Sequence, residues 1–290
     1  MTTEPSTSQS ERCVVVVNSC DAYADVWPLF FAAFKDRWPH CPFPLVVNTE
    51  SLDAAAPGLR VSSHVMAPHE RSSPWGARLL STLKDQSSEY VLMLFDDFVL
   101  EEPVDGEAID RCLGWMDADP SISVFYLSHV PGAARPQSTY PGFEAIPRLT
   151  NYRLNSAPAL WRRQHLIELT REDDNPWIWE LFGTSRTFLH RGRYFCARPG
   201  QETVYRYNYT MGGAIYRGKW VPQVAGPLIE RYGLGIDMRV RGITGERGAP
   251  RTLSEKLRML AQGFRASGLL APVIVWLLLL TKLRARKGQA

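Results

Sequence analysis

Two adjacent carboxylates, Asp96 and Asp97, directly follow the apolar run Tyr90–Phe95. Carboxylates side by side at the end of a buried strand repel each other unless a cation or a hydrogen-bond donor lies there. Hard divalent ions such as Mg²⁺ or Mn²⁺ bind such carboxylates together with phosphate oxygens. The pair therefore predicts a divalent-metal site that also takes a phosphorylated ligand. The alternative is a turn in which an aspartate caps the next element.

Glu180 is the second acidic candidate, because it follows a capped Asn-Pro helix start with Trp177 and Trp179 beside it. Sugars stack on such flat apolar surfaces, and desolvation there raises a carboxyl pKa into a range that suits a general base. The alternative is an ordinary helix acid near the positive end of the dipole, with both tryptophans in the core. Asp173 and Asp174 are rival acids, although acids before a helix are commonly a solvated cap.

Two predicted strands end in small polar residues, Asn18 and Asp21 after the first, Asn48 and Glu50 after the second. Strands of an α/β sheet end in this way at a rim that faces a ligand. Arg78 is a candidate for contact with a base or diphosphate at the same rim. An exposed helix cation is the alternative for Arg78.

Among the remaining polar residues, Lys219 in the run Arg217–Trp220 is a candidate for binding phosphate, of a donor or of a lipid-linked acceptor. The alternative is a solvated basic turn. The six histidines show no metal-binding spacing. His190 is a candidate third metal ligand, and the alternative is a structural role, which is more common for a lone histidine. The sequence contains no G-x-S-x-G motif, P-loop or Rossmann glycine fingerprint.

The elements that must position these residues alternate between strands and helices. Apolar runs predict strands over 13–17, 45–47, 61–65, 90–95, 124–127 and 159–161. Helical spacing predicts helices over 27–38, 75–83, 109–116 and 176–188, and a further helix that follows the strand 159–161 and ends at 169. Ser73 should cap the second helix, with Pro74 at its first position. Residues 129–150, rich in proline, should form a long loop. The predicted fold class is α/β, with one main sheet.

The composition is that of a globular protein. Of 290 residues, 45% are hydrophobic and 22% are charged, which excludes a wholly disordered, collagenous or multi-span membrane chain. Five cysteines without a C-x-x-C pair argue against a zinc ribbon or a secreted disulfide framework and fit a reducing cytoplasm. Residues 1–12 are polar and lack the apolar core of a signal peptide, so we expect a disordered start.

The positive charge is confined to the C-terminus. Residues 251–290 carry eight Lys or Arg and one acid, a net +7, whereas the first 250 residues carry 25 bases and 29 acids, a net −4. Binding of nucleic acid through the body of the protein is therefore not expected. We expect a catalytic domain over 13–250 and a separate basic and apolar helical segment over 251–290.

The C-terminal segment contains an uncharged stretch, 266–281. Sixteen helical residues reach about 24 Å, short of a hydrocarbon core of about 30 Å. The basic residues that follow, up to Lys287, are suited to anionic lipid. We expect 266–287 to associate with a membrane surface or to insert shallowly. The alternative is a helix that covers the catalytic domain or pairs two subunits.

Taken in order, these motifs resemble those of GT-A glycosyltransferases, and more narrowly those of bacterial enzymes of surface-polysaccharide (capsule, lipopolysaccharide or exopolysaccharide) synthesis. The resemblance spans about residues 13–243 and is carried by the runs 73–80, 89–98, 155–163, 175–184 and 217–220. It implies a mixed GT-A-like sheet flanked by helices, a nucleoside-diphosphate sugar as donor and a divalent metal (Mn or Mg).

The resemblance also implies roles for single residues. Asp97 corresponds to the metal ligand of the family's D-x-D-type motif, and Asp96 to the residue near the ribose. Glu180 looks like the acid that activates the acceptor hydroxyl in inverting enzymes. The strand ends at 18–21 and 48–50 lie where GT-A enzymes hold the nucleoside.

The resulting hypothesis is a metal-dependent, inverting glycosyltransferase that acts on a glycan or lipid-linked acceptor, peripheral to the cytoplasmic face of a bacterial membrane. Two alternatives stay open. One is a nucleotidyltransferase of sugar phosphates, which also uses acidic strand ends and a metal. The other is a glycan-binding or assembly subunit that keeps the fold without turnover.

Overall fold

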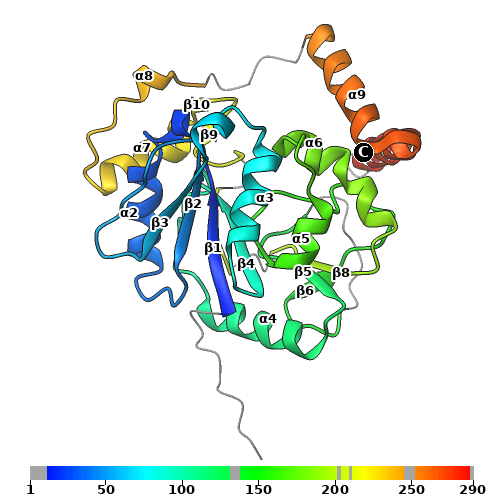
Figure 1. Cartoon of the computed structure of the whole chain (residues 1–290), viewed down its shortest axis with the longest axis horizontal. Helices are drawn as coiled ribbons and strands as arrows, with labels where there is room; N and C mark the ends of the chain where they lie inside the picture. Colours follow the sequence, from blue (N-terminus) through cyan, green and yellow to red (C-terminus); the bar gives the residue numbers. More distant parts are fainter. Residues whose placement is uncertain (1–11, 131–137, 201–203, 209–210, 245–251, 288–290) are drawn as a thin grey trace, which may run out of the picture.

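The structure is a computed structural model that describes residues 12–130, 138–200, 204–208, 211–244 and 252–287. The chain forms one mixed β-sheet between two layers of helices, and a helical arm at the C-terminus lies against one side of this body (Figure 1). The predicted disordered start lies outside the described residues except for Arg12, which forms an ion pair with Asp117.

The main sheet has eight strands. Their bounds are β1 Cys13–Asn18, β2 Leu45–Thr49, β3 Val61–Val65, β4 Tyr90–Phe95, β5 Ile122–Tyr126, β6 Phe143–Ala145, β7 Ala159–Arg162 and β8 Arg193–Ala197. The order across the sheet is β3-β2-β1-β4-β7-β5-β8-β6. All strands run parallel except β7 and β6, which are antiparallel to their neighbours. A separate hairpin joins β9 Ile215–Tyr216 and β10 Lys219–Trp220.

The central strands are buried on both faces. In β1, Cys13, Val15 and Val17 belong to one core cluster and Val14 and Val16 to the other. Successive side chains of a strand point to opposite faces, so a strand that is apolar throughout must be covered on both. This explains why the unbroken Val run forms a central parallel strand.

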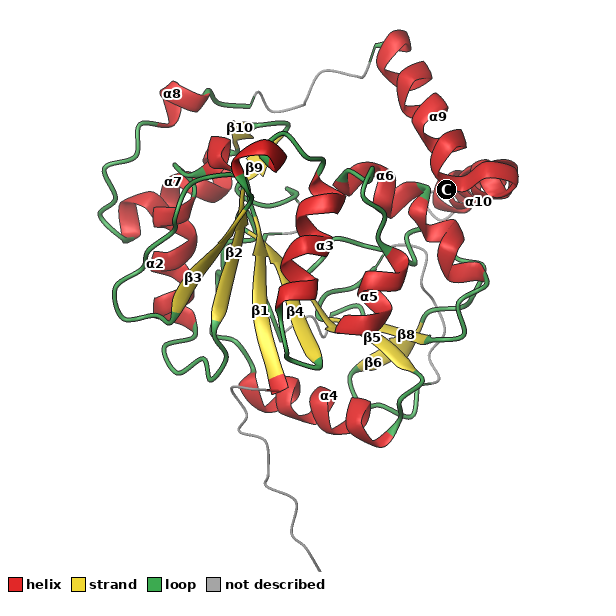
Figure 2. Cartoon of the chain, in the orientation of Figure 1, coloured by secondary structure: helices red, strands yellow, loops and turns green. Residues whose placement is uncertain are grey.

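Helices cover both faces of the sheet (Figure 2). Their bounds are α2 Trp27–Arg37, α3 Trp75–Asp85, α4 Gly106–Ala118, α5 Arg163–Leu169, α6 Pro176–Leu181, α7 Pro222–Arg231, α8 Met238–Arg241, α9 Leu253–Ser267 and α10 Ala271–Lys287, with 3₁₀ helices η1 Asp21–Tyr23, η2 Pro68–Glu70, η3 Gly183–Phe188 and η4 Gly268–Leu270. Buried residues of α2, α4 and α7 pack on one face, and those of α3, α5 and α6 pack on the other.

The structure confirms the predicted α/β class with a main mixed sheet, and it corrects three local expectations. Pro74 rather than Ser73 is the N-cap of α3, and no side chain caps this helix. The expected helix over 176–188 divides into α6 and η3. The expected loop over 129–150 contains the edge strand β6, because Phe143–Ala145 pairs with β8, a strand that the sequence patterns did not predict.

The C-terminal arm is bent rather than straight. Gly268, at φ +53°, opens the short η4 between α9 and α10, which run in different directions in Figure 1. By length and composition, one segment of the described chain, Leu257–Leu279, is apolar enough to cross a membrane, yet it contains this bend. Ile274 is fully buried and clusters with Phe182 of the body. Part of the arm therefore covers the catalytic domain, as the alternative to membrane association expected.

Candidate functional site

One cavity of about 620 Å³ lies at the carboxyl edge of β1 and β4. Parallel strands present their carboxyl ends at one edge of the sheet, where α/β proteins commonly bind ligands. The strand ends, α3, α6 and the β9–β10 hairpin all contribute to its wall. Among its lining residues are Asn18, Ser19, Tyr23, Arg78, Asp96, Asp97, Ser156, Trp177, Glu180, Tyr207, Tyr216 and Arg217.

Asp96 is held rigidly at the floor of the cavity. It is 3% exposed, and its carboxylate accepts a hydrogen bond from the hydroxyl of Ser19. Trp27 Nε1 in turn donates to Ser19 Oγ over 2.7 Å. Burial raises the pKa of Asp96 to about 7, although the Ser19 hydrogen bond acts in the opposite direction. Asp96 therefore has a fixed orientation and a weakened tendency to ionise.

Asp97, the next residue, has a carboxylate that accepts fewer hydrogen bonds from the protein than that of Asp96. Its backbone oxygen accepts from Ala214 N over 2.8 Å, which ties the strand end to the segment before the β9–β10 hairpin. Across the described residues, no other residue donates a hydrogen bond to its side chain. Burial and the neighbouring Asp96 raise the pKa of Asp97 well above its ordinary value.

This donor set fits a divalent cation. Asp96 is buried and Asp97 is partly buried. The carboxylates of these adjacent residues destabilise each other's charge, and a cation between them would reverse that effect. Carboxylate oxygens are the ligands that Mg²⁺ and Mn²⁺ prefer. Because Ser19 occupies one oxygen of Asp96, Asp97 is the residue better placed to bind an ion directly.

Glu180 reaches the same cavity from α6. Asn175 caps this helix, since its side chain accepts from Ile178 N over 3.0 Å. The Glu180 carboxylate accepts from both the backbone N–H and the hydroxyl of Ser156, at 2.6 and 2.5 Å. Burial raises the pKa of Glu180, while the two Ser156 hydrogen bonds partly oppose the shift. The result is an oriented carboxylate with a raised pKa, which are the properties of a general base.

The two tryptophans of α6 have different environments. Trp179 is fully buried in the core, as the structural alternative expected. Trp177 is 55% exposed and lines the cavity. An exposed indole next to a carboxylate offers a flat surface to an apolar sugar face, so only Trp177 keeps the proposed stacking role.

Arg78 is not the exposed cation of the alternative hypothesis. It is 6% exposed, lines the cavity and forms an ion pair with Glu50. Burial lowers the pKa of the Arg78 guanidinium, and nearby Cys20 and Asp21 oppose the shift. Glu50 also accepts from Asp21 N over 2.5 Å. Glu50 therefore acts on the site through Arg78 and does not itself line the cavity.

Three further candidate residues, two from the strand ends and one from the basic run 217–220, do not line this cavity. Asp21 instead accepts hydrogen bonds from Ser51 and from Leu52 N. Asn48 is fully buried and donates to Asn18 Oδ1 over 3.4 Å, because the two asparagines are register partners inside the sheet. Lys219 is exposed: its strand neighbour Trp220 points inward, so alternation directs the lysine outward.

The rival acids and His190, the candidate third metal ligand, lie elsewhere. Asp174 is 1% exposed and forms a two-bonded ion pair with Arg186, at 2.5 and 2.7 Å, so it is a structural residue. Asp173 is exposed and does not line the cavity. His190 contacts Glu168 over 3.5 Å and precedes β8, which begins at the sheet edge opposite to Asp97.

The sequence analysis did not identify several residues that line the cavity. Ser156 lies in a run that carried the family resemblance, yet nothing in its type marked it as the partner of Glu180. Arg217, at φ +51°, lies at the hairpin turn and lines the cavity where Lys219 had been expected. Tyr23 and Tyr207 enter the wall from η1 and from the segment before the hairpin. Only tertiary packing brings these residues to Asp97.

Comparison with known proteins gives distant structural likenesses. No protein-family model matches the chain, and no curated protein matches it either. Among solved structures, it is similar to S. aureus TarS, with 15% identity and a TM-score of 0.46 over 88% of this chain. The chain spans only 43% of that TarS structure. It spans 83% of the shorter TarS 1–349, with 14% identity and a TM-score of 0.42 over 91% of this chain.

A third similar structure is the mannosyltransferase PcManGT from Pyrobaculum calidifontis, in complex with GDP-Man and Mn²⁺. Its identity is 16% and its TM-score 0.41, over 91% of this chain and 78% of that one. Because the sequence identities and TM-scores are this low, the assignment of a function rests on the geometry of the chain's own cavity.

Proposed function

We propose that this protein is a metal-dependent glycosyltransferase that moves a sugar, with inversion, from a nucleoside-diphosphate donor to a glycan or lipid-linked acceptor of a bacterial surface polysaccharide. The observation that carries the proposal is the meeting of Asp96, Asp97 and Glu180 in one cavity. Two carboxylates suited to a cation and a third suited to a base come from separate elements, and Trp177 lies beside them.

The donor half of the cavity consists of the strand ends and Arg78. A divalent ion held by Asp97 would supply positive charge to the leaving diphosphate. Asp96, fixed by Ser19, faces the same space and is suited to a ribose hydroxyl. Arg78, oriented by Glu50, and Arg217 add two guanidinium groups, which bind phosphate oxygens well.

The acceptor half is formed around Glu180. Ser156 holds the carboxylate through two hydrogen bonds, so the oxygen that takes the acceptor's proton has a defined position. Trp177 offers the acceptor sugar an apolar surface. The hydroxyl loses its proton to Glu180 as it attacks the anomeric carbon, and the nucleoside diphosphate departs on the opposite side.

Membrane association at the cytoplasmic face is part of the proposal, and the structure adds residues to the expected 266–287. On α9, four side chains at helical spacing form an exposed apolar stripe, defined by Leu253, Leu257, Leu260 and Phe264, which are 40–73% exposed. A different side of α9, with Gly263 against Phe182, packs on the body. An exposed apolar stripe and a basic C-terminal sequence are together suited to an anionic lipid surface.

The test is a panel of UDP-, GDP-, CMP- and dTDP-sugars, scored by thermal shift and by release of the free nucleotide (a nucleoside diphosphate, or CMP from the CMP-sugar), with and without Mn²⁺. One donor should raise the melting temperature and be turned over only with metal. Asp97→Asn should remove both effects, while the matched variant Asp173→Asn, altered at an exposed acid outside the cavity, should keep them.

Three results would contradict the proposal. Unchanged Mn²⁺-dependent turnover in Asp97→Asn would remove the metal assignment. Release of pyrophosphate from a nucleoside triphosphate and a sugar phosphate would show a nucleotidyltransferase. Donor binding without any turnover, in the presence of acceptor extracts, would show an assembly subunit.

A further inference from the structure

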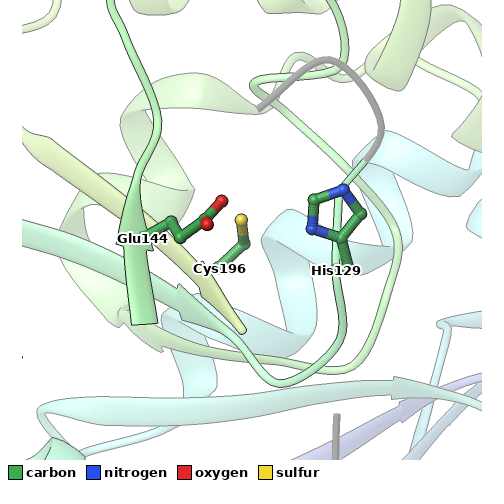
Figure 3. A group of neighbouring side chains, drawn as sticks. All are labelled: His129, Glu144 and Cys196. Carbon is green, nitrogen blue, oxygen red and sulfur yellow. The ribbon is translucent and has the colours of Figure 1, made fainter. Parts of the chain in front are cut away.

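A second group of metal-ligand side chains lies in the far part of the sheet. Glu144 on β6 and Cys196 on β8 are direct cross-strand partners, and His129 follows the end of β5. One ligand atom from each of the three lies within 4.8 Å of those of the other two. Figure 3 shows the three side chains pointing toward one another from three separate segments.

This group is separate from the Asp97 cavity. None of its three residues lines that cavity, and β7 and β5 lie between β4 and β8 in the sheet. Its chemistry differs as well, because it contains a thiol and an imidazole whereas the Asp96–Asp97 pair offers only carboxylate oxygens. An inference about it does not depend on the proposed glycosyl transfer.

His129 provides an independent indication of a missing partner. Its Nδ1 is shielded from solvent and has no hydrogen-bond partner in the described part of the chain. A buried polar atom without a partner costs free energy, and most such atoms in proteins are satisfied. In Figure 3 a ring nitrogen of His129 is turned toward Cys196 and Glu144. A cation bound there would satisfy it.

We propose that His129, Glu144 and Cys196 bind one Zn²⁺ ion. Zinc accepts thiolate, imidazole and carboxylate together, whereas Mg²⁺ and Mn²⁺ prefer oxygen ligands. Bonds of about 2.0–2.3 Å require the ligand atoms to lie closer together than 4.8 Å, so binding needs a small closure of side chains. The Cys196 thiol loses its proton to solvent on binding, and three protein ligands leave one coordination position for water.

The ion would stabilise the edge strand β6 against local unfolding. β6 has only three residues and pairs with β8 alone at the edge of the sheet. Zinc would join the chain just after β5 to β6 and β8, and so close the connection between positions 129 and 144 into a loop. Cross-links of this kind stabilise a fold because they restrict the unfolded chain.

The test measures bound zinc directly in the full-length protein. The experiment uses Asp97→Asn as the parent chain, so that the other proposed metal site does not contribute. Competition with a chromophoric chelator should show one tightly bound Zn²⁺ per chain. Co²⁺ in its place should give a thiolate-to-cobalt charge-transfer band. Cys196→Ser should lose the band and weaken zinc binding beyond the roughly 10- to 100-fold that loss of an outer hydrogen-bonding partner costs.

Two further variants keep the test decisive. Cys41→Ser, at a half-buried cysteine outside the group, is the matched control and should retain both signals. Glu144→Gln, on the edge strand, should weaken zinc binding even if Cys196→Ser does not fold. Absence of stoichiometric zinc in the parent chain, or unchanged zinc binding in Cys196→Ser, would overturn the proposal.

Discussion

At the scale of single residues, Glu180 differs from Asp96 and Asp97 because it enters the cavity from α6, where Ser156 donates two hydrogen bonds to it. Gln is nearly isosteric, and its amide oxygen can still accept from Ser156. We therefore expect Glu180→Gln to bind the donor normally and to lose transfer by about 100-fold or more, because the amide cannot take a proton. Donor affinity by calorimetry and single-turnover transfer rates measure the two effects separately.

Near-normal transfer by Glu180→Gln would remove Glu180 from the base role. Asp174 could not replace it, because Arg186 occupies both of its oxygens. Retention of configuration in the product, determined by NMR on the early reaction, would separately contradict the inverting mechanism.

Ser156 permits a prediction about pH. A base must be ionised, so transfer should increase with pH as Glu180 loses its proton. Burial has raised this pKa, and the hydrogen bonds from Ser156 restrain the rise. Ser156→Ala removes one donor to the charged form, which raises the pKa further. The acidic limb of the pH profile of kcat should move to higher pH by about one unit.

A merely structural role of Ser156 predicts a different result. Transfer would then fall equally at all pH values, and the position of the acidic limb would not change. Ser156→Thr, which keeps the hydroxyl, should restore the wild-type limb.

At the scale of elements, the β9–β10 hairpin is positioned by Gly213. This residue has φ +93°, and a Cβ there would lie 2.8 Å from the backbone oxygen of Asp97. Gly213→Ala should therefore push the hairpin away from the strand end. We expect a loss of at least about 1 kcal/mol of stability from the left-handed backbone, together with weaker donor binding, measured by denaturant unfolding and calorimetry.

Gly233→Ala is the matched control for this prediction. Gly233 also has a positive φ, +59°, but a Cβ there meets no atom within 4 Å. It should lose comparable stability and keep its donor affinity. Equal donor affinities in the two variants would show that contact between the hairpin and Asp97 does not matter.

At the scale of the whole molecule, the C-terminal arm combines a buried anchor with an exposed apolar stripe. The triple variant Leu257→Gln, Leu260→Gln and Phe264→Gln removes apolar area that a membrane would cover, without changing the anchor at Ile274. Each buried side chain of this type contributes about 1.5–3 kcal/mol. We expect binding to anionic vesicles to weaken by at least about 100-fold in co-sedimentation, with the melting temperature unchanged.

Leu189→Gln is the control for the arm, because Leu189 is 83% exposed and lies outside it. It should bind vesicles as the wild type does. Vesicle binding that survives the triple variant would place the membrane contact elsewhere. A deletion of the arm is less informative, because it would also uncover Phe182.

The sequence alone determined the central strands of the sheet, the helices α2 to α5 that flank them, and the chemically distinctive residues. The Val run of β1 and the apolar run before Asp96 predict buried parallel strands because no exposed strand can be apolar on both faces. The carboxyl pair and Glu180 could be singled out because their types and neighbours are unusual. Short or edge elements such as β6 and β8 were missed, since a few residues carry too little periodicity to be distinguished from a loop.

Only the tertiary structure decided which polar residues share the cavity. Asn48 and Lys219 have suitable chemistry, but register buries the first inside the sheet and alternation turns the second outward. The sequence left Arg78 open between a ligand contact and an exposed helix cation, and burial together with the ion pair to Glu50 decided for the cavity. Side-chain direction depends on register, hairpin geometry and helix packing, which join residues far apart in the chain. Residue type and local spacing do not contain that information.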